Sequence, residues 1–316
     1  MITIRRYDPA TDREAWDAFV ADSRNASFLF YRGYMDYHSD RFADYSLMAY
    51  DGHDRLLAVL PACREGATLY SHRGLTFGGW LLPRRRCDAL DMLEIFDALA
   101  SAMRLAGIEH LVYKAIPYIY SHQPAQEDIY AMTRAGARIT TSLVSSVIDL
   151  RDPIPFDMGS RQRARKAAAS GIVIGESDRW DEFWGVLTEL LRERFDATPV
   201  HSLDEIRLLR SRFPSNIRLV AATDPATGEI LAGIVLYIND TAIHSQYTAA
   251  TPRGKQLSVV PALYQYIIDT YRDTSRWLDL GTSNEDGGRE VNPGLLRQKC
   301  SYGARAVAYL TFTLDF

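Results

Sequence analysis

Residues 217–249 read IRLVAATDPATGEILAGIVLYINDTAIHSQYTA, and this stretch decides the fold. Its apolar runs predict strands at Ile217–Thr223, Ile230–Ile238 and Thr241–Ala249. Between them lie Asp224-Pro225-Ala226-Thr227-Gly228 and Asn239-Asp240, which are typical turn sequences. Because short turns join antiparallel neighbours, the stretch predicts a meander of antiparallel strands.

The residues on either side of this meander predict further helices and strands. A strand at Gly171–Glu176 and helices at Asp181–Phe195 and Leu203–Phe213 precede it. After it come a glycine-bearing loop at Thr251–Lys255, helix Leu257–Tyr271, strand Arg276–Gly281, helix Pro293–Gly303 and strand Ala304–Phe316. Strands that are joined through a helix should lie parallel, so Arg276–Gly281 is expected beside Thr241–Ala249 in that orientation.

The same order of elements is found in the first part of the chain. Its predicted strands are Met1–Tyr7, Tyr45–Tyr50, Leu56–Cys63, Ala67–Arg73, Glu109–Ile116 and Arg138–Leu150, and its predicted helices are Asp12–Asp22, Gly33–Asp40, Cys87–Ala106 and Ala125–Ala135. The repeat predicts two similar domains, 1–150 and 171–316. A chain of 316 residues also exceeds what one core usually supports.

A basic linker, residues 151–170, separates the two domains. Pro153 and Pro155 favour an extended start, and the Arg/Ala-rich remainder favours a short helix. Its cations are Arg161, Arg163, Arg165 and Lys166. They form either a solvated helix face or a site for phosphate.

Composition narrows the classes of function. With 47% hydrophobic and 24% charged residues, the chain is an ordinary globular protein, and a net charge of −4 gives no reason to expect DNA binding. Cys63, Cys87 and Cys300 form no CxxC pair, so neither a disulfide framework nor a metal site is expected. No apolar run approaches the roughly 18 residues of a membrane span, so we expect a cytoplasmic protein without membrane insertion. The oligomeric state is left open.

Six segments, taken together with the repeated order of elements, carry a family resemblance. They are Ser71–Gly79, Tyr113–Pro117, Pro199–Ser202, His244–Tyr247, Gly281–Glu285 and Gln298–Gly303. On them the chain resembles the FemAB-like proteins, which are tandem GNAT acyltransferases, over nearly its whole length. The resemblance implies an α/β (α+β) fold of two GNAT-like domains, each a mixed, mainly antiparallel sheet flanked by helices.

In GNAT enzymes, the loop after the fourth strand presents backbone N–H groups to the pyrophosphate of acyl-CoA. Arg253, Gly254, Lys255 and Ser258 stand at that place, so the resemblance implies that they bind the donor, most simply acetyl-CoA. The family's second glycine is absent from this loop. FemAB-like relatives commonly use aminoacyl-tRNA, which is the alternative donor.

Transfer of an acyl group to an amine needs a base and a group that stabilises negative charge. His201, His244 and Glu285 are the candidate bases, although either histidine could equally have a structural role. The resemblance implicates Lys299 in catalysis; a lysine near the end of a helix could instead complement the helix dipole. In relatives the next residue is often acidic, whereas here it is Cys300.

The acceptor is expected to be a small-molecule amine or an amino sugar, bound in a cleft of the second domain or between the domains. The expected acceptor-binding residues are His72, Lys114, Gln246, Tyr247, Ser283 and Asn284. The favoured hypothesis is therefore an N-acyltransferase that uses acyl-CoA. The alternatives are an aminoacyl-tRNA-dependent peptidyltransferase acting on a cell-wall precursor, and a non-catalytic double-GNAT binding protein. A tRNA partner is less favoured because the chain has little basic surface.

Overall fold

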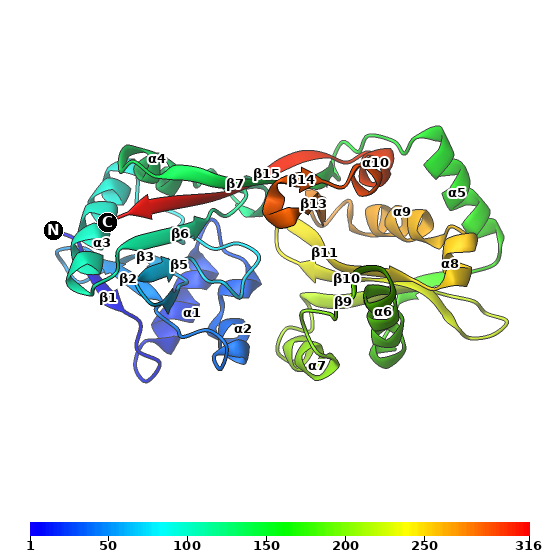
Figure 1. The fold of residues 1–316 in the computed structure, drawn as a ribbon, viewed down its shortest axis with the longest axis horizontal. Helices are drawn as coiled ribbons and strands as arrows, with labels where there is room; N and C mark the ends of the chain where they lie inside the picture. Colours follow the sequence, from blue (N-terminus) through cyan, green and yellow to red (C-terminus); the bar gives the residue numbers. More distant parts are fainter. The chain divides into compact units, whose positions relative to one another are not determined.

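The computed structural model describes residues 1–316, with every side chain except that of Phe195. Its contacts divide the chain into two units, Met1–Leu143 with Ala308–Phe316, and Val144–Val307. Each unit contains a sheet of mixed strand directions with helices packed against it (Figure 1), which confirms the predicted fold class.

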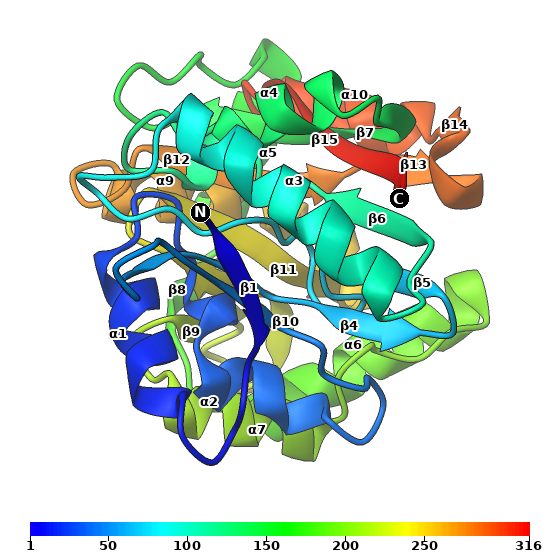
Figure 2. The same ribbon diagram turned by 90° about the vertical axis from the view of Figure 1, so that its left-hand side faces the viewer.

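The strands of the first unit belong to two separate sheets. Its strands are β1 (Thr3–Arg6), β2 (Leu47–Tyr50), β3 (Leu56–Leu60), β4 (Cys63–Glu65), β5 (Thr68–Tyr70), β6 (His110–Lys114) and the first part of β7 (Arg138–Asp149). Its helices are α1 (Arg13–Asp22), α2 (Arg32–Met35), α3 (Ala89–Leu105) and α4 (Glu127–Arg134). Figure 2 faces this unit and shows α3 in front of its strands. Met92, Phe96 and Leu99 of α3 share one buried cluster with strand residues such as Leu60 and Leu111.

The second unit contains the sheet predicted from residues 217–249. Its strands are β8 (Val173–Glu176), β9 (Ile217–Thr223), β10 (Ile230–Ile238), β11 (Ala242–Ala250) and β12 (Trp277–Thr282), with the small hairpin β13 (Asn284–Glu285) and β14 (Glu290–Val291). Its helices are α5 (Met158–Ala169), α6 (Trp180–Phe195), α7 (Leu203–Arg212), α8 (Pro252–Gln256), α9 (Val259–Tyr271) and α10 (Pro293–Ser301).

Helices cover both faces of this second sheet. Leu263 and Ile267 of α9 join a buried cluster with residues of β9, β10 and β11. On the opposite face lie α6 and α7 (Figure 1). There Phe183 of α6 packs so closely on Gly233 that a Cβ added to this glycine would lie 2.6 Å from the ring. The basic segment predicted between the domains forms α5, which packs against α9.

Two long strands, β7 and β15 (Arg305–Asp315), belong partly to each unit. The second part of β7 pairs antiparallel with β12, for example Ile148 with Leu278. The last part of β15 pairs antiparallel with β6, for example Phe312 with Tyr113. Each of these terminal strands therefore completes a sheet together with a strand from the other repeat of the sequence.

In the first unit the observed elements follow the predicted ones closely, with local differences at two places. The strand expected at Leu56–Cys63 is divided into β3 and β4, because Pro61 between them has no N–H to donate. The helix expected at Gly33–Asp40 consists of the single turn α2 and a 3₁₀ turn at Asp36–His38. Among the described residues, no helix has both the length and the apolar character that a membrane crossing requires.

Candidate active site

In the second unit, β11 and β12 run side by side for only a short distance. In their parallel pairing, Ala242 lies opposite Trp277, Ile243 opposite Leu278 and His244 opposite Asp279. Beyond these pairs the two strands part. Gly281 adopts φ 79°, a left-handed conformation that glycine tolerates, just beyond this point. A Cβ added to Gly281 would lie 3.5 Å from Cε1 of His244. We call the place where the strands separate, marked by His244 and Asp279, the fork.

His244 is held at the fork by a buried carboxylate. Its Nδ1 lies 2.9 Å from Oδ2 of Asp279, whose side chain is fully buried. The other carboxylate oxygen, Oδ1, accepts hydrogen bonds from Ser145 Oγ at 2.5 Å and from the Gly281 backbone N–H at 2.9 Å. An acceptor at Nδ1 favours the tautomer that carries its proton there. Nε2 of His244 is thereby left with a lone pair, and no described residue bonds to it.

Lys299 reaches the same strand end from α10. Its Nζ donates to the backbone carbonyls of Gly281 and Thr282, both at 2.8 Å. Burial lowers the pKa of Lys299 to about 8, and the nearby Asp279 carboxylate opposes that shift. The side chain therefore changes charge within the ordinary working range of an enzyme.

The residues that follow β12 differ in exposure. Ser283 is almost fully buried, and its Oγ has no hydrogen-bond partner among the described residues. Asn284 Oδ1 accepts the Val144 backbone N–H at 2.7 Å, which ties the turn to β7. Glu285 is exposed and accepts a hydrogen bond from Asn292 Nδ2 at 2.7 Å. This bond ties Glu285 to the residue that follows β14, and Glu285 bonds to neither His244 nor Lys299.

A β-bulge interrupts β11 next to His244. Val235 of β10 pairs with Tyr247, whereas Leu236 pairs with Ser245, so Gln246 is an extra residue without a partner across the ladder. Ser245 and Thr248, three positions apart, hydrogen-bond to each other at 3.0 Å and therefore lie on one face of the strand. The simple alternation that would place His244 and Gln246 on one face does not hold through this bulge.

His201 and Tyr247 form a second polar group of the same unit. The Nδ1 of His201 lies 2.6 Å from the Tyr247 hydroxyl, which also accepts the His201 backbone N–H at 3.3 Å. The Tyr247 ring packs edge-on against Trp184 of α6, and burial raises its pKa to about 12. The group therefore lies beside α6.

The loop predicted to bind the donor is a short helix, α8, and some of its polar groups already bond to other residues of the second unit. The Gly254 N–H donates to Thr251 Oγ1 at 3.0 Å, and the Arg253 guanidinium pairs with Asp224 at 2.5 Å. A Cβ on Gly254 would lie 2.0 Å from the Leu231 carbonyl oxygen, so packing alone requires glycine here. Lys255 is exposed, and Ser258 adopts a left-handed conformation just before α9.

The remaining predicted residues, His72 and Lys114, lie together in the first unit. His72 is buried, stacks on His38 with ring centroids 5.1 Å apart, and has an Nδ1 without a partner among the described residues. Burial lowers its pKa to about 3. Lys114 Nζ donates to the Leu75 carbonyl at 3.3 Å, and burial lowers its pKa as well.

Sequence reasoning did not select Asp279 or Ser145. A signal for Asp279 was present, because it is a carboxylate in the middle of the apolar strand Trp277-Leu278-Asp279-Leu280, and a buried charge normally requires a partner. Ser145 carries no such signal, since hydroxyls are common on strands. In the described part of the chain, no group of three or more His, Cys, Asp or Glu residues is arranged to hold a metal ion.

Comparison with known proteins agrees with this architecture. Residues 159–286 match the family model of the acetyltransferase (GNAT) domain, whereas no curated protein sequence matches the chain. The structure of FemX is similar with a TM-score of 0.72 and 10% identity, covering 99% of this chain and 97% of that one. A tandem GNAT protein from the clavulanic acid biosynthesis pathway has a TM-score of 0.53 and 12% identity, covering 100% and 98%.

A third similar structure is that of L-PGS from Bacillus licheniformis, with a TM-score of 0.63 and 14% identity, covering 98% of this chain and 93% of that one. At such identities the likeness establishes the fold, and the matched family model lies over the unit that contains the fork. Residues 159–286 thus match the acetyltransferase (GNAT) domain, and the fold of the chain is that of FemX and of the tandem GNAT protein.

Proposed function

We propose that this chain is an N-acyltransferase that moves an acyl group, most simply acetyl from acetyl-CoA, to the amine of a small molecule or an amino sugar. The observation that carries this proposal is the His244–Asp279 pair at the fork of β11 and β12. An imidazole whose Nδ1 proton is held by a buried carboxylate presents a basic Nε2, which is what a reaction that deprotonates an amine needs.

In the proposed reaction, the amine attacks the thioester carbonyl and loses a proton to Nε2 of His244. The new C–N bond forms, the C–S bond breaks, and His244 returns the proton to the departing thiolate. Asp279 does not take up the proton; it holds the ring and stabilises the imidazolium. Lys299 ammonium has a third hydrogen beyond those given to Gly281 and Thr282, and this hydrogen is available to the tetrahedral oxyanion.

The other predicted residues have more distant roles in this proposal. Gln246 at the bulge, Ser283 and Asn284 next to the fork, and the Tyr247–His201 group on the α6 side would contact the acceptor. Lys255 and Ser258 remain the proposed contacts of the donor phosphates, beside the first N–H groups of α9. Arg253 and Gly254 would support that loop through Asp224 and Thr251.

An aminoacyl-tRNA donor is an equally supported alternative. Its ester, like a thioester, is an activated carbonyl, so the chemistry proposed for His244 applies unchanged. The fold likeness to FemX supports this alternative, whereas the likeness to the tandem GNAT protein supports acyl-CoA. With a tRNA donor the chain would act as a FemAB-type peptidyltransferase on a cell-wall precursor.

The test presents the purified chain with each donor and a panel of amines. Release of CoA thiol and loss of aminoacyl ester are followed separately, and the products are identified by mass spectrometry. We expect His244→Gln to lower kcat by about 100-fold or more with either donor. His53→Gln, which removes an exposed histidine of the first unit, is the matched control and should be without effect.

Two results would reject the proposal. A His244→Gln variant that transfers at the wild-type rate would remove the fork from the chemistry. A wild-type chain that transfers from neither donor to any amine in the panel would leave the non-catalytic binding protein as the better reading of the fold.

A further inference from the structure

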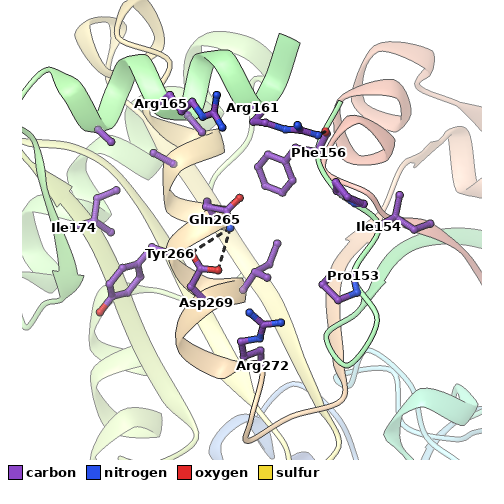
Figure 3. A pocket seen from close by; sticks show the side chains of 15 residues that line it. Pro153, Ile154, Phe156, Arg161, Arg165, Ile174, Gln265, Tyr266, Asp269 and Arg272 are labelled. Atoms are coloured by element: carbon purple, nitrogen blue, oxygen red, sulfur yellow. Dashed lines mark hydrogen bonds between the residues drawn. The ribbon is translucent and has the colours of Figure 1, made fainter. Parts of the chain in front are cut away.

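The second unit contains a cavity of about 680 Å³ away from the fork (Figure 3). It lies between α5, the C-terminal part of α9 and the segment 153–156, and none of its lining residues belongs to the fork. Most of the lining is apolar; Phe156, Ala168 and Ile174 are representative. Ile154, also in the lining, is 43% exposed, which is unusual for so large an apolar side chain.

Arginines stand around this apolar space. Figure 3 shows Arg161 and Arg165 on α5 at one side and Arg272 at the end of α9 at the other. Arg161 donates to the Phe156 carbonyl at 3.0 Å. For the guanidinium groups of Arg165 and Arg272, no described side chain or carbonyl is a hydrogen-bond or ion-pair partner.

The one acidic residue of the lining, Asp269, is already hydrogen-bonded to another lining residue. Asp269 accepts two hydrogen bonds from Gln265 Nε2, each of 3.1 Å, and this pair is drawn at the centre of Figure 3. The lining therefore carries three guanidinium groups against one carboxylate. An apolar cavity with an excess of unpaired cations at its edge suits a ligand that is apolar along its length and negative at one end.

We propose that this cavity binds an alkyl chain that ends in a compact anion. The chain lies on Phe156, Ile174 and the alanines of α5, and the anion lies between Arg165 and Arg272. The volume falls within the roughly 300–1,000 Å³ of sites that enclose small ligands. A fatty carboxylate and a long-chain phosphate monoester share this chemistry. A nucleotide fits less well, because Gln265 and Asp269, which would read a base, bond to each other.

This proposal does not depend on the proposed acyl transfer, and the two can fail separately. Binding is measured by titration calorimetry on the full chain with decyl phosphate and decanoate, both below their micellar concentrations. Inorganic phosphate, AMP and the neutral decyl maltoside are the comparison ligands. We expect saturable binding of decyl phosphate, of decanoate or of both, and the two arms show which anion is preferred.

Variants localise the binding. The double variant Arg165→Gln/Arg272→Gln should weaken the anionic ligands by about tenfold or more, because two charge-assisted contacts are lost. Ala168→Trp should block the space for the chain and abolish binding. Lys166→Gln removes a cation from the same helix but outside the lining, so it should bind like the wild type. Circular dichroism and thermal unfolding check that each variant is folded.

Several outcomes would overturn the proposal. Absence of binding by both decyl anions would refute it directly. Binding that is unchanged in both the arginine variant and Ala168→Trp would place the ligand elsewhere. If decyl maltoside bound as tightly as the decyl anions, the arginines would not recognise an anion. If AMP bound more tightly than either decyl anion, the ligand of the cavity would be a nucleotide and not an alkyl chain.

Discussion

Asp279 is the residue on which the proposed role of His244 depends, because its Oδ2 accepts from Nδ1. In Asp279→Asn an amide replaces the carboxylate, so the imidazolium formed in the reaction loses its counter-charge and the tautomer is no longer fixed. We expect kcat to fall by about 100-fold or more with little change in KM. Steady-state kinetics of Asp279→Asn, His244→Gln and the double variant check this.

Residues that act as one unit have non-additive effects on rate. The double variant should therefore be little worse than His244→Gln alone. If the loss of kcat in the double variant equalled the product of the two single losses, the two residues would act independently and not as one unit. Ser145→Ala, which removes only the hydroxyl donor to Asp279 Oδ1, serves as a milder control for disturbance of the buried carboxylate.

The lowered pKa of Lys299 allows us to predict how the rate of acyl transfer depends on pH. Because burial lowers its pKa to about 8, the side chain is charged below that pH and neutral above it. An ammonium that stabilises the oxyanion would thus be lost as pH rises through about 8. The amine acceptor itself becomes more reactive at high pH, so the useful quantity is the ratio of kcat/KM between wild type and Lys299→Met.

This ratio should be large and constant below pH 8 and should fall toward one above it. A ratio that is independent of pH from about 6 to 10 would indicate that Lys299 contributes only through the carbonyls of Gly281 and Thr282, as a structural element of the strand end. Sequence analysis selected His244 as a candidate base and Lys299 through the family resemblance. It could not reveal that one buried carboxylate lies near both, because that pairing depends on the register of β11 and β12.

At the scale of elements, the packing of α8 on the sheet allows us to predict how one added methyl group changes stability. Gly254 packs against the Leu231 carbonyl of β10, so Gly254→Ala should force the helix away from the sheet. We expect the free energy of unfolding to fall by about 2 kcal/mol or more, a typical cost of overpacking. Chemical denaturation without any donor present measures it.

Gly185 of α6 provides the matched control. It is exposed, and a Cβ added there would meet no atom within 4 Å. Gly185→Ala should therefore stabilise the chain by about 0.5–1 kcal/mol, through helix propensity alone. If Gly254→Ala were as stable as the wild type but bound the donor more weakly, the glycine would be required by the ligand and not by packing.

The elements themselves were largely predictable, because each has a strong local signal. The meander from Ile217 to Ala250 and helix α9 follow from apolar periodicity and turn residues. The bulge at Gln246 was not predictable. Two paired strands with equal alternation give no local sign that one of them contains an extra residue, and the hydrogen bond between Ser245 and Thr248 reveals it only in three dimensions.

At the scale of the whole molecule, the exchange of terminal strands was equally hidden from the sequence. The order of elements is the same whether β15 completes the sheet of its own repeat or that of the first, since both pairings are antiparallel to a strand of similar composition. Long-range pairing is decided by side-chain packing. Phe312 and Leu314 of β15 are buried in the core cluster of the first unit, together with Leu111 of β6.

This arrangement makes a prediction about the C-terminus. Removal of residues 308–316 should weaken the first unit, because β6 loses its antiparallel partner and the core loses Phe312 and Leu314. Hydrogen exchange followed by mass spectrometry should show faster exchange in β6 and α3, while β9 and β10 of the second unit keep their protection. The milder change Phe312→Ala should act on the same segments at a cost of about 3–5 kcal/mol. Faster exchange confined to the second unit would show instead that β15 supports the repeat from which it comes.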